Sequence, residues 1–112
     1  MCFMLICAAL AAEPVQGQTD FQKICATCHT NEPNRNSVGP SLYGVIGRHA
    51  GSAPGFDYSQ AMKAAPIVWD DDTLDRYLSD PKAVVPGNKM PYQGVKKPDQ
   101  RREIIAYLNT LR

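Results

Sequence analysis

Hydrophobic residues recur at helical spacing in a few stretches of the chain, which are separated by long stretches without such a pattern. Four side chains share one face of the first predicted helix: Phe21, Ile24, Cys25 and Cys28. Thr19, followed three residues later by Gln22, forms a capping box and predicts the start of that helix. The sequence C-A-T-C-H at residues 25–29 therefore closes a short amphipathic helix.

Residues 70–79 form a second helical stretch. Three aspartates, at positions 70 to 72, lie at its start, where the helix dipole favours negative charge. Its apolar stripe consists of Leu74, Tyr77 and Leu78, and Pro81 ends it. A shorter helix is predicted within residues 56–65, where Pro66 stops it.

The last predicted helix covers residues 98–111. Its buried face consists of Ile104, Ile105, Leu108 and Leu111, with Tyr107 beside them. Residues 31–55 and 81–97 are instead rich in glycine and proline and show no strand-like alternation. The pattern predicts an all-α fold with helices at both ends and irregular segments between them. Long irregular segments in a small domain usually wrap around something.

The composition adds three limits to this picture. The 112 residues are enough for one domain. Twelve basic and 11 acidic residues leave a formal charge of +1, which argues against nucleic acid as a partner. A mature domain of this size has a small core, and a bound cofactor is a natural source of extra stability.

The first twelve residues carry no charged side chain. They are too few to span a bilayer, which excludes stable membrane insertion, but they suit a secretory signal peptide at residues 1–12. Ala9-Leu10-Ala11 offers a cleavage motif, so cleavage is expected near residues 11–17. A buried N-terminal helix and lipidation at Cys7 are the alternatives. Cleavage would remove Cys2 and Cys7 and leave only the two cysteines of C-A-T-C-H.

Three interpretations of C-A-T-C-H compete. A zinc site needs four ligands, and the only other histidine, His49, is distant in the sequence. A thioredoxin-like dithiol needs a preceding strand, which the pattern does not show. Covalent haem attachment explains every residue, because Cys25 and Cys28 can bond to the two vinyl groups while His29 lies under the iron. Chance predicts only about 0.002 such motifs in a chain of this composition.

An electron-carrying haem has a second axial ligand, for which His49, Met62 and Met90 are candidates. Met90 lies far downstream in a loop bracketed by prolines, which favours it as the ligand. Met62 is predicted to fill the core, and His49 to be solvated. Two axial ligands leave no open site for a substrate, so the sequence indicates electron transfer rather than enzymatic chemistry.

With these motifs, the chain resembles the class I cytochromes c, especially the mitochondrial-type and soluble α-proteobacterial monohaem proteins. The resemblance covers residues 17–112, which are expected to form one cytochrome c domain. The matching segments include Gly17 with Phe21, the V-G-P-S-L sequence at 38–42, P-G-x-K-M at 86–90 and I-I-A-Y-L at 104–108. The resemblance implies a small fold in which the N- and C-terminal helices cross and loops wrap one covalent haem c.

The resemblance also implies roles for single residues. The Pro40 carbonyl would accept a hydrogen bond from the His29 imidazole, and Tyr77 would lie near the methionine sulfur. The residues expected at the haem propionates are Arg48, Tyr58, Trp69 and Asn88. Asn88 is a departure, because the family often has threonine there. Met62 is another, because it replaces a polar residue and predicts a drier pocket.

The implied function is that of a monomeric periplasmic shuttle for single electrons. Its partners would be a quinol-cytochrome c oxidoreductase, a terminal oxidase, a reaction centre or a periplasmic dehydrogenase. Lysines are sparse on the expected docking face, where the remaining ones are Lys23, Lys82, Lys89, Lys96 and Lys97. Weak electrostatic steering then indicates partners with a modestly acidic or partly apolar face. The alternatives are a peroxidase-like or ligand-binding haem protein with a labile Met90, and a zinc or dithiol module.

Overall fold

The computed structural model describes residues 14–112, so the predicted signal peptide lies outside the described residues. The described chain is all-α, as predicted, and within it the only pairing of extended backbone is an isolated antiparallel bridge between His49 and Val68. Its elements are α2 (Pro14–Asp20), the π-helical η1 (Phe21–Cys25), α3 (Gln60–Ala64), α4 (Asp71–Ser79), α5 (Pro81–Val84) and α6 (Pro98–Leu108). Among these elements, none is long and apolar enough to cross a membrane.

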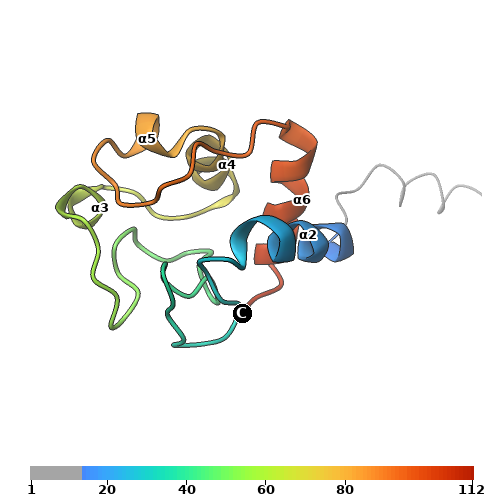
Figure 1. The fold of residues 1–112 in the computed structure, drawn as a ribbon, viewed down its shortest axis with the longest axis horizontal. Helices are drawn as coiled ribbons and strands as arrows, with labels where there is room; N and C mark the ends of the chain where they lie inside the picture. The colour runs from blue at the N-terminus through green and yellow to red at the C-terminus, as the bar shows by residue number, and fades with distance from the viewer. Residues whose placement is uncertain (1–13) are drawn as a thin grey trace, which may run out of the picture.

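The N- and C-terminal helices pack against each other, as predicted. In Figure 1, α2 and α6 cross at one end of the molecule, and α3 lies at the other end. Gly17 makes this crossing possible, because a Cβ atom there would lie only 1.9 Å from the Glu103 carbonyl oxygen. Next to this contact, the rings of Phe21 and Tyr107 pack with their centroids 5.4 Å apart, and both side chains are buried.

The predicted start of the first helix was wrong. The chain is already helical from Pro14, and the Thr19 hydroxyl donates to the Val15 carbonyl one turn earlier instead of capping a helix end. From Phe21 the backbone widens into η1 and ends at Cys25, so C-A-T-C-H does lie at the end of a helix. A threonine followed by glutamine is thus also compatible with the interior of an amphipathic helix.

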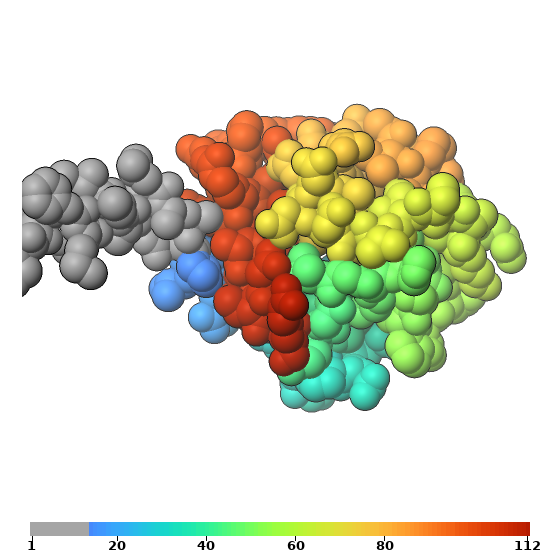
Figure 2. Space-filling model, turned by 180° about the vertical axis from the view of Figure 1, so that it is seen from behind, coloured from blue at the N-terminus to red at the C-terminus, as the bar shows by residue number. Residues whose placement is uncertain are grey.

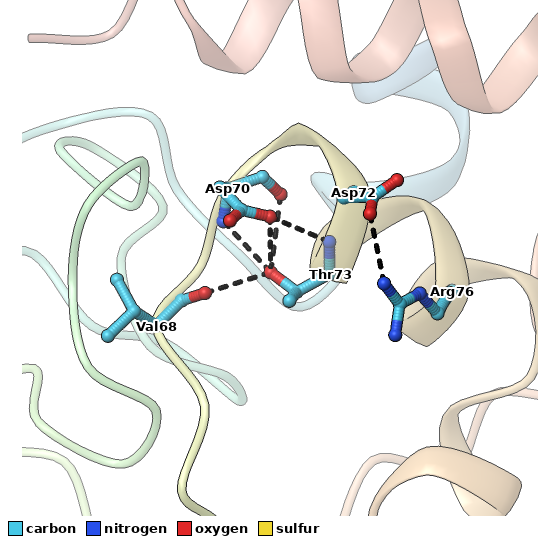
Figure 3. Close-up of polar contacts among 5 residues, drawn as sticks. All are labelled: Val68, Asp70, Asp72, Thr73 and Arg76. Atoms are coloured by element: carbon cyan, nitrogen blue, oxygen red, sulfur yellow. Dashed lines mark hydrogen bonds and ion pairs between the residues drawn. The ribbon is translucent and has the colours of Figure 1, made fainter.

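The predicted helix at 70–79 is confirmed as α4, with Asp70 as its N-cap. Figure 3 shows the capping box: Asp70 Oδ1 accepts from the Thr73 backbone N–H at 2.8 Å, and Thr73 Oγ1 accepts from the Asp70 N–H at 2.9 Å. One turn further on, Arg76 pairs with Asp72 at 2.9 Å on the exposed face. The opposite face buries Leu74 and Tyr77.

The other boundaries differ from the sequence pattern in physically simple ways. α3 is shorter than the predicted 56–65 because Ser59 caps it, and Ala65 takes the extended conformation that a following proline favours. The segment predicted as an irregular loop from residue 81 begins with α5, which has Asp80 as N-cap and Pro81 in its first turn. α6 ends at Leu108 rather than 111, with Asn109 as its C-cap.

Residues 31–55 contain no helix, as predicted, and this long loop closes the lower side of the molecule in Figure 1. The C-terminal residues hold part of the loop. The Gly44 N–H donates to the Leu111 carbonyl at 2.7 Å, and the Tyr43 hydroxyl donates to the Arg112 carbonyl. Figure 2 shows this contact from behind, where the dark red end of the chain lies against the green segment.

Candidate functional site

Every residue predicted to hold the haem lines one cavity of about 420 Å³. These residues are Cys25, Cys28, His29, Pro40, Arg48, Tyr58, Trp69, Tyr77, Asn88 and Met90. They come from the end of η1 and the residues just after it, the long loop, the segments before and after α3, α4, and the loop after α5. Segments far apart in the sequence are thus brought together.

The two cysteines lie where the first helix ends. The N–H groups of Cys28 and His29 both donate to the Cys25 carbonyl, at 3.1 and 2.9 Å, so the backbone turns tightly over C-A-T-C-H. Both cysteines are half-buried, carry free thiols and line the same cavity. The turn therefore presents two thiols and an imidazole to one space.

The His29 ring is held by a single strong contact. Its Nδ1 lies 2.7 Å from the Pro40 carbonyl oxygen. Because a carbonyl can only accept, Nδ1 carries the proton and donates, which leaves Nε2 with its lone pair free to bind a metal. Burial lowers the pKa of His29, while the Pro40 carbonyl opposes this and the nearby Arg48 charge adds to it. The ring is thus held in the neutral form that ligates iron.

The loop below His29 approaches the ring closely. A Cβ atom on Gly39 would lie 2.4 Å from Cε1 of the ring, so only glycine fits there without moving the imidazole. The same loop is tied back to the motif, because the Gly39 N–H donates to the Cys28 carbonyl at 2.7 Å and the Leu42 N–H to the Thr30 carbonyl at 3.0 Å. These bonds fix the Pro40 carbonyl in place relative to the ring.

The geometry does not suit the zinc or dithiol interpretations. Within residues 14–112, no three side chains of the metal-binding types His, Cys, Asp and Glu lie close enough to share an ion. Burial, and secondarily the charge of Asp20, raise the pKa of the Cys25 thiol to about 11. A dithiol redox site needs the opposite shift, because its thiolate is the nucleophile.

The cavity is apolar with a positive edge. Only two of its lining side chains are permanently charged, Arg48 and Lys89, and no acidic side chain of the described residues lines it. The Arg48 Nη2 donates to the Ser41 carbonyl at 2.9 Å, but its buried Nε has no hydrogen-bond partner. Burial also lowers the pKa of Arg48. An anionic group such as a carboxylate would satisfy this buried, unpaired Nε of a half-buried guanidinium.

Of the three candidates for the second axial ligand, Met62 and Met90 both line the cavity, whereas His49 is exposed and does not. Met90 lies in the loop after α5 and is half-buried. Met62 comes from α3 and packs against the buried core.

The sequence did not identify all of the residues that line the cavity. Ile104 and Leu108 were predicted as the buried face of the last helix, and they also line the cavity. Val38 and Tyr92 line it while remaining 67% and 38% exposed, so they lie at its mouth. Helical periodicity marks residues as buried but does not distinguish a core contact from a cofactor contact.

The residues present fit a covalently attached haem. Two thiols three residues apart match the two vinyl groups, and a neutral imidazole follows them directly. The apolar wall suits a porphyrin, and the unpartnered Arg48 Nε suits a propionate. The fold and the site thus define a small all-α protein organised around one haem.

The chain belongs to the cytochrome c family: the family model described as cytochrome c matches residues 14–112. The cytochrome c2 of Rhodopila globiformis is 50% identical over 105 residues, which cover 94% of this chain and 99% of that protein. The cytochrome c2 of Rhodomicrobium vannielii is 48% identical over 104 residues, covering 92% and 82%. The solved structure of cytochrome cH from Methylobacterium extorquens aligns with a TM-score of 0.82 at 41% identity, covering 88% of this chain and 98% of that one.

The family settles the broad function that the sequence predicted. The chain is an electron carrier of the cytochrome c2 type rather than an enzyme, and the family implies one covalent haem c.

Proposed function

We propose that this protein is a periplasmic shuttle that carries single electrons through a haem bound to Cys25 and Cys28, with His29 and Met90 as axial ligands. The observation that carries this assignment is the 2.7 Å contact between His29 Nδ1 and the Pro40 carbonyl oxygen in a cavity that Met90 also lines. That contact leaves Nε2 as the only ring nitrogen available to iron.

Bound haem supplies the one-electron couple between ferric and ferrous iron. A thioether is a neutral, soft ligand, so Met90 would stabilise the ferrous state and raise the reduction potential of a bound haem. Pro40 orients His29. Arg48, Tyr58 and Trp69 are the residues we place at the propionate side, and Tyr77 near the methionine sulfur. These polar side chains hold the group, and none is needed as a general acid or base.

The proposed donors and acceptors are periplasmic redox proteins: a quinol-cytochrome c oxidoreductase, a terminal oxidase, a reaction centre or a dehydrogenase. The protein would act as a monomer that is neither inserted in a membrane nor bound to nucleic acid. Three lysines of the expected docking face are already engaged within the protein. Lys82 and Lys96 donate to backbone carbonyls, and Lys89 lies 3.4 Å from Asp57. With Val38 and Tyr92 exposed at the cavity mouth, this favours partners that present a partly apolar face.

Visible absorption of the protein matured in a competent periplasm tests the assignment. After acid-acetone extraction, covalent haem stays with the polypeptide. The oxidised protein should then show the weak far-red band of a sulfur–iron bond, and the reduced protein sharp bands. Retained haem without the far-red band would refute Met90 as ligand and favour the peroxidase-like alternative. Complete loss of haem to the solvent would refute the attachment at Cys25 and Cys28.

A further inference from the structure

The backbone of the Met90 loop is held from inside by one buried amide. The side chain of Asn88 is part of a residue only 5% exposed. Its Nδ2 donates to the carbonyls of Pro81 and Val85, at 3.0 and 2.9 Å, and its Oδ1 accepts from the Met90 N–H at 2.8 Å. Pro81 begins α5 and Val85 is its C-cap, so the amide ties Met90 to both ends of that short helix.

The chemistry of this contact is specific to asparagine. A primary amide has two N–H donors and one carbonyl acceptor, and here both donors and the acceptor are engaged. A threonine hydroxyl has a single donor and could not bond to both carbonyls at once. Because both N–H groups of Asn88 are used by the backbone, none remains free for a haem propionate. The contacts therefore give Asn88 a different task from the one implied by the resemblance.

A second side chain of α5 holds the same loop from outside. The Nζ of Lys82 donates to the carbonyl of Asn88 at 2.8 Å and to that of Met90 at 3.2 Å. Lys82 is exposed, so solvent competes with its bonds and they contribute less than the buried amide. Hydrogen bonds from the Asn88 amide and from the Lys82 ammonium thus both connect residues 88–90 to α5.

We propose that Asn88 is a positioning residue for the Met90 thioether, and that Lys82 restrains the same loop more weakly. It acts by fixing the Met90 backbone, so that the sulfur is held at the iron and resists displacement by other ligands. This inference rests on the proposed axial role of Met90.

Imidazole binding to the ferric holoprotein is the sharpest test, because added imidazole must displace Met90. We expect N88A to bind imidazole at least about tenfold more tightly than wild type, which corresponds to about 1.4 kcal/mol. N88T keeps one donor and one acceptor and should lie between the two. K82A should tighten binding by only about two- to threefold, in line with its exposed bonds.

The controls are I105V and I105A on α6. Ile105 is buried but does not line the cavity, so these variants lower global stability at a position outside the cavity wall. Denaturant unfolding identifies which Ile105 variant loses as much stability as N88A does. The imidazole affinity of that matched control should stay within about twofold of wild type. If N88A yields no holoprotein, the comparison of N88T with wild type and the same controls decides the matter.

The outcomes separate this proposal from the assignment of Met90. M90A should lose the far-red band that wild type shows and bind imidazole most tightly of all. If wild type and M90A are indistinguishable, Met90 is not the ligand and both proposals fail. If M90A behaves as expected but N88A or N88T matches the Ile105 controls, Met90 keeps its role and the positioning role of Asn88 is refuted.

Discussion

Arg101 on α6 donates from Nε to Oδ1 of Asp75 on α4 over 2.8 Å, with an arginine side chain only 11% exposed. Its Nη1 also donates to the Val95 carbonyl at 2.8 Å, so one guanidinium joins two helices and the segment after the Met90 loop. We expect R101A to lower the free energy of unfolding by about 2–4 kcal/mol, because both Asp75 and the Val95 carbonyl lose their partner. Denaturant unfolding of the holoprotein measures this.

D75N tests how much of the R101A effect comes from the ion pair alone. The Asp75 side chain is 49% exposed, so water partly takes over the hydrogen bonding of the carboxylate that D75N removes. The arginine also keeps its carbonyl partner. The expected loss is therefore about 1 kcal/mol or less. Equal losses for D75N and R101A would show that the ion pair, and not the whole set of arginine contacts, carries the stability.

The crossing of α2 and α6 makes a second prediction. An added Cβ at Gly17 would lie 1.9 Å from the Glu103 carbonyl oxygen and 2.8 Å from Cβ of Tyr107. Because backbone must move to relieve this, G17A should cost about 3 kcal/mol or prevent accumulation of the holoprotein. Q18A, at the exposed neighbouring position on α2, is the matched control and should change stability little. A fully stable G17A would contradict the tight crossing.

The main helices could be predicted from the sequence because their signals are local. Asp70 caps α4 through Thr73 only three residues away, and the stripe of α6 follows from simple periodicity. The start of α2 was misplaced because Thr19 and Gln22 have a capping pattern that is equally acceptable inside a helix. α5 was missed because prolines at both ends suggested only a break, although Asp80 followed by Pro81 is also a helix start.

C-A-T-C-H predicted where the candidate site lies because the motif is rare by chance and fixes the chemistry around it. The resemblance added residues that no local pattern marks, such as Arg48 and Trp69, and both line the cavity. Neither route predicted the contacts of Asn88 or Lys82. Those depend on which carbonyls the fold of α5 and the following loop brings within reach, and such long-range geometry is absent from local sequence patterns.

The Asp70 cap predicts a pH dependence. Hydrogen bonds from the backbone and side chain of Thr73 lower the pKa of Asp70 below its ordinary value of 3.8. The stabilising charge is therefore fully present above pH 3.8 and is lost as the pH falls through the lower folded-state pKa. D70A should lower the thermal midpoint at pH 7, and its difference from wild type should shrink below pH 3.8.

D70N separates the cap from the charge. Asparagine is as good an N-cap as aspartate but does not titrate, so D70N should retain most of the stability at pH 7. Its difference from wild type should also shrink on acidification. A difference between D70A and wild type that stays constant from pH 7 to the most acidic conditions would contradict the lowered pKa.

We expect substitutions of Met62 to change the reduction potential of the haem. Its thioether lines the cavity from α3, where the resemblance expects a polar residue, and it packs against the buried core. M62N would place an amide dipole in the apolar wall, and a more polar surrounding stabilises the extra positive charge of ferric iron. The potential of M62N, measured by spectroelectrochemical titration, should therefore be lower than that of wild type.

M62L is the control for this variant. It keeps the site apolar with nearly the same volume, so its potential should stay close to that of wild type. A fall of equal size in M62L would mean that packing, and not polarity, sets the effect of this position.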